Sequence, residues 1–365
     1  WMLWLEGQAS YASFDGYATF KTLLLSQIDP NFQTFLRPDS PRTVRLEEVV
    51  WGGVAKDGIP ALVDPRFIAA GDADWLWDGE PVFGVEIGGD IRAYPHRIMD
   101  WHEMANDTVG GVPVALAYCT LCGSGVLYET AAAGRDAPFE FGSSGLLYRS
   151  NKLMYDRQTH SLWNHFTARP VIGPLVDSGI VLKTRPLAVA RWSDWKQRHP
   201  ATRVLALDTG HQRDYAPGRP YGNYFGSPGL MFPSRTADAR LRPKDIVFVV
   251  RATEGLRAWP VKAFGKGRVL NDAIGARAIV VIGDGRGETA RAYDRGAVRF
   301  TSRLDGSAAA PDALFDDTGR RWRADEDALT ADDGRRLARL PAHNAYWFAF
   351  ASFIGEGGTL FEETQ

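Results

Sequence analysis

The chain contains an internal sequence repeat, which restricts the folds that it can adopt. Residues 83–129 align without a gap with residues 248–294, at an offset of 165 residues throughout. The matched pairs include Arg92 and Arg257, Pro95 and Pro260, Asn106 and Asn271, and Asp107 and Asp272. Solenoid repeats are much shorter, about 20–50 residues. We therefore expect two pseudo-symmetric duplicated halves packed as one globular unit, whose matched segments superpose with the same strand order.

Weaker matches extend the repeat and suggest its boundaries. Residues 154–163 resemble 314–322, and residues 186–195 resemble 341–350. The sequence predicts an N-terminal extension over 1–44 and a first repeat over 45–205. A turn-rich linker over 206–229 then leads to a second repeat over 230–365.

The local patterns predict an α+β class that is rich in strands. Residues 83–95 alternate around Gly88-Gly89, which is typical of a β-hairpin. Residues 95–106 predict a short helix that starts at a proline and stops at Asn106 and Asp107. Residues 112–119 and 124–129 are expected to be strands on either side of a turn.

Composition excludes some partners and leaves others open. A net charge of -2 in 365 residues gives no attraction to nucleic acid, so we expect a small molecule or a metal ion as ligand. The longest apolar run, 345–354, is about half of what a membrane span needs. The chain does not begin with methionine, which leaves open export or anchoring through a segment further upstream. Neither compartment nor oligomeric state follows from the sequence.

The only two cysteines, Cys119 and Cys122, form one C-x-x-C motif. In the second repeat Asp284 and Gly287 stand at these positions, and Gly267 stands where the first repeat has His102. Residues needed for the fold should persist in both copies, whereas a chemical site can be lost from one. The motif lies between two predicted strands, where the following Gly-Ser-Gly lets two sulfurs converge as in half of a zinc knuckle.

Two cysteines cannot make a four-cysteine zinc site, so a metal would need other ligands. His102 is the predicted third ligand, since Ile98, His102 and Ala105 share one face of the predicted helix. Met154, replaced by Leu314 in the second repeat, is the predicted fourth, and such a soft set favours Cu(I) over Zn. The alternatives are a core histidine and a core methionine.

The other candidates carry less weight. His96 is expected to be exposed at the start of the helix, and His160 and His165 are expected to be surface residues. Asp156 and Arg157 are expected to form a buried ion pair. Asp156 is also a candidate catalytic residue, together with the two thiolates, in the lyase hypothesis given below.

Residues 84–129 and 143–163 resemble the bacterial family catalogued as domain of unknown function 3179, as do 213–225 and 341–353. The resemblance runs from about residue 45 to 360. It implies that the family pattern includes His102, Cys119, Cys122, Met154, Tyr155, Asp156 and Arg157. It also implies that His160 and His165 stand where other residues are usual, and that members are often exported or membrane-anchored. No function is attached to the family.

Four functional hypotheses remain open at this point. The first is a metal-dependent enzyme, possibly an oxidoreductase, with Cu(I) or Zn on Cys119, Cys122 and His102. The second is a metal-handling or structural-metal protein with the same site and no turnover. The third is a dithiol/disulfide redox protein that cycles the two cysteines. The fourth is a lyase acting on a soft electrophile such as an organometal, with two thiolates and Asp156.

Overall fold

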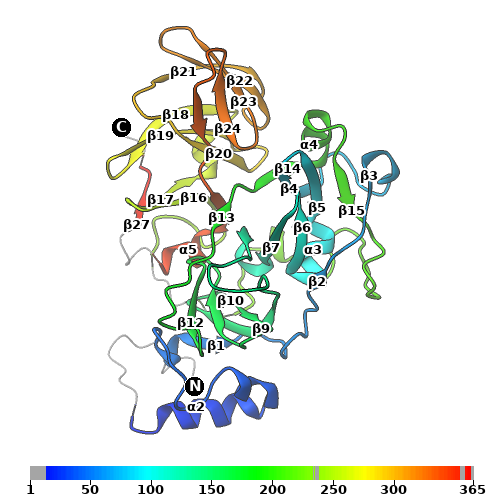
Figure 1. Cartoon of the computed structure of the whole chain (residues 1–365), viewed down its shortest axis with the longest axis vertical. Helices are drawn as coiled ribbons and strands as arrows, with labels where there is room; N and C mark the ends of the chain where they lie inside the picture. Colours follow the sequence, from blue (N-terminus) through cyan, green and yellow to red (C-terminus); the bar gives the residue numbers. More distant parts are fainter. Residues whose placement is uncertain (1–13, 233, 235–237, 354–357, 363–365) are drawn as a thin grey trace.

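Strands dominate the computed structural model, which describes residues 14–232, 234, 238–353 and 358–362 (Figure 1). This confirms the strand-rich α+β prediction. The short 3-10 helices are η1 (Pro30–Thr34), η2 (Leu46–Glu48), η3 (Ala70–Asp72), η4 (Thr120–Cys122), η5 (Tyr224–Gly226) and η6 (Val261–Phe264). The α-helices are α2 (Tyr17–Ser26), α3 (His96–His102), α4 (Trp192–Arg198) and α5 (Trp347–Ala351). In the part of the chain that the structure describes, no helix is both long and apolar enough to cross a membrane.

Three sheets are built from residues before the linker. The first has the order β14 (Ala188–Arg191), β4 (Pro81–Ile87), β5 (Asp90–Pro95), β15 (Arg203–Leu205), β3 (Phe67–Ala69). The second has the order β13 (Thr184–Arg185), β8 (Ser124–Glu129), β7 (Val112–Cys119), β6 (Met104–Val109), β2 (Leu62–Val63). The third has the order β1 (Val49–Trp51), β9 (Phe141–Tyr148), β10 (Asn151–Asp156), β11 (Leu162–Asn164), β12 (Arg169–Ile172).

Three further sheets follow the linker. One has the order β26 (Ala342–Tyr346), β16 (Ile246–Ala252), β17 (Gly255–Pro260), β27 (Gly358–Leu360). The next is β18 (Arg268–Ile274), β19 (Arg277–Asp284), β20 (Thr289–Asp294). The last is β21 (Phe300–Gly306), β22 (Pro311–Asp316), β23 (Arg321–Ala324), β24 (Ala328–Ala331), β25 (Arg336–Ala338).

Four strands before the linker and four after it begin and end at positions that differ by the same 165 residues as the sequences. β4, β5, β7 and β8 lie 165 residues before β16, β17, β19 and β20. In both parts a hairpin joins the first two strands, and a partner pairs with the second of them in parallel, β15 with β5 and β27 with β17. The predicted turn at Gly88-Gly89 is present, with φ of 58° and 82°, values that suit glycine in a two-residue hairpin turn.

Asn106 and Asp107 are not a helix stop, so that prediction was wrong. Helix α3 ends at His102 because Glu103 takes the left-handed conformation, with φ of 53°. Asn106 and Asp107 then lie in strand β6, which pairs antiparallel with β7. Ala105 is in the same strand and does not share a helix face with His102.

These two adjacent side chains connect β6 to both neighbouring sheets. Asn106 donates through Nδ2 to the Phe141 carbonyl at 2.9 Å and accepts from its N–H at 2.8 Å, which ties β6 to β9. Asp107 accepts from Arg92 at 2.5 Å and from the Tyr94 hydroxyl at 2.6 Å, which ties β6 to β5.

The same contacts occur after the linker. Asn271 makes the equivalent pair of bonds with Phe300, at 2.7 and 2.9 Å. Asp272 accepts from Arg257 and from the Trp259 ring N–H, both at 2.9 Å. The residues that recur in both stretches of sequence therefore hold sheets together.

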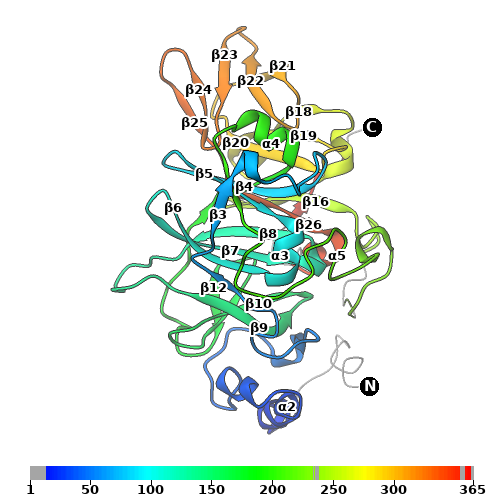
Figure 2. The same cartoon turned by 90° about the vertical axis from the view of Figure 1, so that its right-hand side faces the viewer.

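The parts before and after the linker meet at β8 and β26, which lie against each other in the middle of the molecule (Figure 2). The largest core cluster spans this contact. It includes Leu25 from α2, Leu153 from β10, both cysteines and Trp347 from α5. Burial of apolar area is the main source of stability in such a core, so the two parts form one hydrophobic unit.

We predict unequal costs for removing the two aspartates. Asp107→Ala should lower the free energy of unfolding by about 3 kcal/mol, because Arg92 and Tyr94 would lose a shared acceptor in a buried setting. Asp272→Ala should cost about 1 kcal/mol, because its side chain is 17% exposed, against 5% for Asp107, and water can replace it. Urea unfolding measures both.

The control is Asp208→Ala. Asp208 pairs with Arg66 on the surface, where both side chains are mostly exposed, so the loss should be under about 0.5 kcal/mol. Equal losses for Asp107→Ala and Asp208→Ala would show that the contacts of Asp107 do not hold the sheets together.

Candidate functional site

The C-x-x-C motif forms the turn between two paired strands, as predicted. Cys119 is the last residue of β7 and pairs with Ser124, the first residue of β8. The turn between them is the single 3-10 turn η4, which closes at Gly123 with φ of 61°. A side chain is disfavoured at that φ, and a Cβ there would lie 3.2 Å from the Tyr346 ring.

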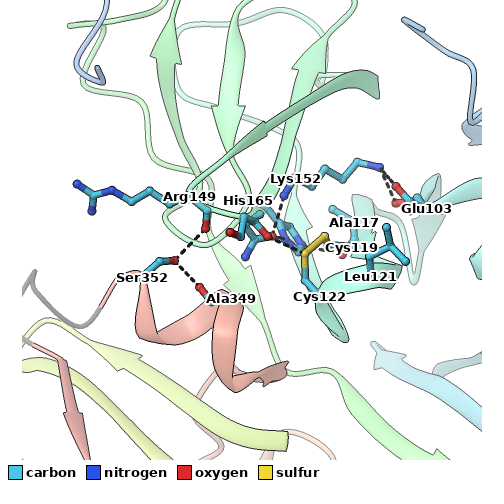
Figure 3. Close-up of a disulfide and its surroundings, with 12 residues drawn as sticks. Glu103, Ala117, Cys119, Leu121, Cys122, Arg149, Lys152, His165, Ala349 and Ser352 are labelled. Atoms are coloured by element: carbon cyan, nitrogen blue, oxygen red, sulfur yellow. Dashed lines mark hydrogen bonds and ion pairs between the residues drawn. A yellow bond between two sulfur atoms is a disulfide. The ribbon is translucent and has the colours of Figure 1, made fainter. Parts of the chain in front are cut away.

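The turn brings the two sulfurs together in a disulfide between Cys119 and Cys122, whose Cα atoms are 5.2 Å apart. Cys119 is 4% exposed and Cys122 is fully buried. The Cys122 sulfur lies 3.1 Å from the Ser150 carbonyl oxygen, and the His165 ring lies beside the pair (Figure 3). Lys152 points away from the sulfurs toward Glu103, its partner at 3.0 Å.

His102 is buried at the end of α3, and both of its ring nitrogens have partners other than the cysteines. Its Nδ1 lies 2.8 Å from the Pro60 carbonyl and its Nε2 lies 2.7 Å from the Tyr215 hydroxyl. Burial lowers the pKa of His102 to about 4, so the ring is neutral at pH 7. In the neutral ring Nδ1 donates to the carbonyl and Nε2 accepts from the hydroxyl, which leaves no lone pair for a metal.

Met154 and Asp156 lie in β10 and are also engaged elsewhere. Met154 is buried in a core cluster with Met104, Ala117 and Trp163, separate from the cluster that holds the cysteines. Asp156 accepts from the N–H and hydroxyl of Thr159 and from the Trp163 ring N–H, which fixes the turn after β10.

The expected ion pair between Asp156 and Arg157 does not form. Arg157 instead pairs with Asp57 at 3.2 Å and with Glu140 at 2.9 Å. The Asp156 carboxylate instead accepts the hydrogen bonds within the turn after β10. After the linker, Asp316 makes the equivalent contacts with Thr318 and Trp322.

Of the four predicted metal ligands, the structure brings together only the two cysteines. In the described ranges no group of three or more His, Cys, Asp or Glu side chains is placed to hold a metal ion. The metal site, with His102 and Met154 as further ligands, therefore stays a prediction.

Two further histidines, His165 and His343, are buried. His165 is fully buried rather than on the surface, with ring nitrogens 2.9 Å from Asn151 Oδ1 and 3.0 Å from the Ala117 carbonyl. His343 packs on Phe166, with ring centroids 4.9 Å apart. Both rings are neutral, because burial lowers the pKa of each to about 3.

A cavity of about 480 Å³ lies next to the motif turn. Its lining comes from both sides of the linker and includes Phe83, Tyr118, Gly123, Asn344 and Tyr346. Tyr118 precedes Cys119 in β7, so strand alternation places the tyrosine on the cavity side and the cysteine on the opposite side.

Helix α3 contributes His96 and Asp100 to this cavity, one turn apart on the same face. His96 was expected to be exposed, but it stacks on Phe83, with ring centroids 4.1 Å apart, and burial lowers its pKa to about 3. Asp100 is 7% exposed, and burial together with the Glu103 and Glu80 carboxylates raises its pKa. Within the described ranges, His96 Nε2 and Asp100 Oδ1 are buried atoms without a hydrogen-bond partner.

The linker contributes residues that the sequence reasoning did not find. Tyr215 contacts His102, Tyr221 donates to Glu103 at 3.2 Å, and Tyr224 donates to the Leu121 carbonyl at 2.7 Å. The signal in the sequence was the presence of three tyrosines within 215–224, which a solvated linker does not need.

We predict that acid destabilises the protein through its buried neutral histidines. His343 has a pKa of about 3 when folded and about 6.5 when unfolded, so between these values the unfolded state binds more protons and stability falls as pH falls. His343→Leu should reduce the loss of stability between pH 7 and pH 5 by up to about 2 kcal/mol.

Urea unfolding at both pH values measures this change. Phe166→Leu is the control, because it disturbs the same ring contact without removing a titratable group, so it should leave the pH dependence unchanged. An unchanged pH dependence in His343→Leu would mean that His343 is protonated in the folded protein at pH 5.

The comparisons with known proteins give one match. No curated protein and no solved structure matches the chain. A family model described as "Protein of unknown function (DUF3179)" matches residues 56–357, which is most of the chain and includes the motif turn, both cavity walls and the linker. The chain therefore belongs to the DUF3179 family, as its sequence motifs indicated.

Proposed function

We propose that this is a dithiol/disulfide redox protein that works by cycling Cys119 and Cys122. The observation that carries the proposal is that these two cysteines, the only ones in the chain, are bonded to each other at a hairpin turn. The predicted nitrogen ligand of a metal site, His102, is engaged by Pro60 and Tyr215 instead.

The proposed reaction is thiol–disulfide exchange with an external dithiol. One thiolate of that dithiol attacks a sulfur of the Cys119–Cys122 bond and forms a mixed disulfide. The second thiolate then displaces the remaining protein sulfur, so that two electrons and two protons reach Cys119 and Cys122 while the dithiol becomes a disulfide. The Ser150 carbonyl can accept a hydrogen bond from the reduced Cys122 thiol.

The two sulfurs lie under a cover formed by the β9–β10 turn at Arg149 and Ser150 and its contact with Ser352. This cover makes the exchange slow and controllable. The β9–β10 turn at Arg149 and Ser150 lies over Cys122, and the Ser352 hydroxyl, just after α5, contacts the Arg149 carbonyl at 2.8 Å (Figure 3). The surrounding core is apolar, which disfavours the reactive thiolate. A partner therefore reaches the pair only when this turn moves.

We further propose that the chain arose by duplication and that only the first copy keeps the redox pair. The support is the shared strand order, the common 165-residue offset of strand bounds, and the repeated contacts of Asn106 with Phe141 and Asn271 with Phe300. Asp284 and Gly287 replace the cysteines in the second copy.

We predict that protein isolated without reductant or metal carries the disulfide and is about 2 Da lighter than its reduced form. Reduction should expose two thiols per chain, and Cys119→Ser or Cys122→Ser should abolish the mass difference. His102→Asn and Met154→Leu are matched controls that should leave the redox titration unchanged. One equivalent of tightly bound copper or zinc, lost in Cys119→Ser and weakened in both controls, would replace this proposal with the metal site.

We also predict that the cover limits thiol reactivity. In the reduced protein, Ser352→Ala should raise the rate of iodoacetamide labelling several-fold, because the Arg149 carbonyl loses a partner and the turn opens more often. Thr34→Ala removes an exposed contact of the same kind far from the site and should not change the rate. Equal labelling rates in wild type and Ser352→Ala would mean that the turn does not control access.

A further inference from the structure

The cavity beside the motif turn has features of a ligand site that the redox proposal does not use. Cys119 and Cys122 are both described by the structure, and neither lines this cavity. Its volume, about 480 Å³, is in the range of small-molecule sites. Any ligand there would touch residues from both sides of the linker.

Asp100 supplies the first argument. It is 93% buried, it lines the cavity, and within the described ranges its Oδ1 has no hydrogen-bond partner. Buried carboxyl oxygens in native proteins nearly always have a partner, because an unpaired one costs free energy. His96, one turn earlier on α3, adds a second buried polar atom without a partner, Nε2.

The charges around Asp100 supply the second argument. Glu80 is paired with Arg97, and Glu103 is paired with Lys152, so these carboxylates have their own cations. Asp100 has no such partner among the described residues, and burial beside these carboxylates raises its pKa. A cation bound next to Asp100 would lower that pKa and stabilise the carboxylate, so a cation is the charge that would complete this part of the cavity.

The exposed arginines in the lining do not supply that cation. Arg191 and Arg286 line the cavity but are exposed, and water and salt screen exposed charges. Asp100 lies deeper, where electrostatic interactions are stronger.

The walls supply the third argument. Phe83, Tyr118 and Tyr346 face the cavity and are nearly fully buried, each 8% exposed or less. Aromatic faces attract cations and also accept apolar groups. Gly125 leaves room for the Phe83 ring, since a Cβ at Gly125 would lie 2.5 Å from it.

We propose that this cavity binds a small organic cation, an amine whose ammonium group pairs with Asp100 and whose apolar body packs on Phe83, Tyr118 and Tyr346. The neutral ring of His96 offers a second acceptor for the ammonium hydrogens. This site is independent of the redox pair and goes beyond the proposed function.

The test compares three probes of the same shape on the full chain by calorimetry: benzylamine, neutral benzyl alcohol and anionic benzoate. Benzylamine should bind the wild type, and the other two should bind at least about tenfold more weakly, as expected for loss of a charged hydrogen bond. Phenethylamine and cyclohexylamine extend the series to other apolar bodies.

Two variants separate the role of Asp100 from a general effect of surface charge. Asp100→Asn should weaken benzylamine binding at least about tenfold while leaving thermal stability equal or higher, because a buried unpaired carboxyl is removed. Asp208→Asn, on the exposed surface outside the cavity, should change the affinity less than about twofold.

Three results would overturn the proposal. The first is that benzoate or benzyl alcohol binds as tightly as benzylamine. The second is that Asp100→Asn is folded and binds benzylamine as the wild type does. The third is that none of the three amines binds the wild type.

Discussion

Two neighbouring side chains on one strand hold the first three sheets together. Asn106 satisfies both backbone groups of Phe141 in the third sheet, and Asp107 gathers Arg92 and Tyr94 from the first sheet. A buried amide or carboxylate whose polar atoms are unpaired costs free energy, so these hydrogen bonds fix the position of each sheet relative to the other two. The motif turn depends on this arrangement, because it joins β7, the partner of β6, to β8.

One hairpin therefore presents two different environments. Along β7 the side chains alternate, so Tyr118 faces the cavity while Cys119 enters the core cluster on the opposite side. Tyr118 and Cys119 are adjacent in sequence, but strand β7 lies between the cavity and the sulfurs. A redox change at the turn and a ligand in the cavity would act on the same backbone, at Gly123 and Tyr118, without sharing any reacting atom.

Local patterns predicted the local parts of the structure. The hairpin at Gly88-Gly89, the position of Cys119 at a strand end and the strand-rich class follow from turn chemistry and alternation, and all are confirmed. The end of α3 was missed because Glu103, which is not a usual left-handed residue, stops it. The hydrogen bonds of the His102 ring could not be predicted from the helix pattern, because its partner Tyr215 lies 113 residues away in the sequence. The burial of His96 and Asp100 likewise depends on walls that come from distant strands.

The shared cavity wall also bears on how such a gene can evolve. Tyr346 and Asn344 close the cavity from the side that carries no cysteine. A shortened gene that ended at the linker would keep both cysteines but lose this wall and the core contact around Trp347. Selection on a bound ligand alone would then preserve the C-terminal half of the gene, even though that half contains no cysteine, and would free its outer sheet of β21–β25 to diverge.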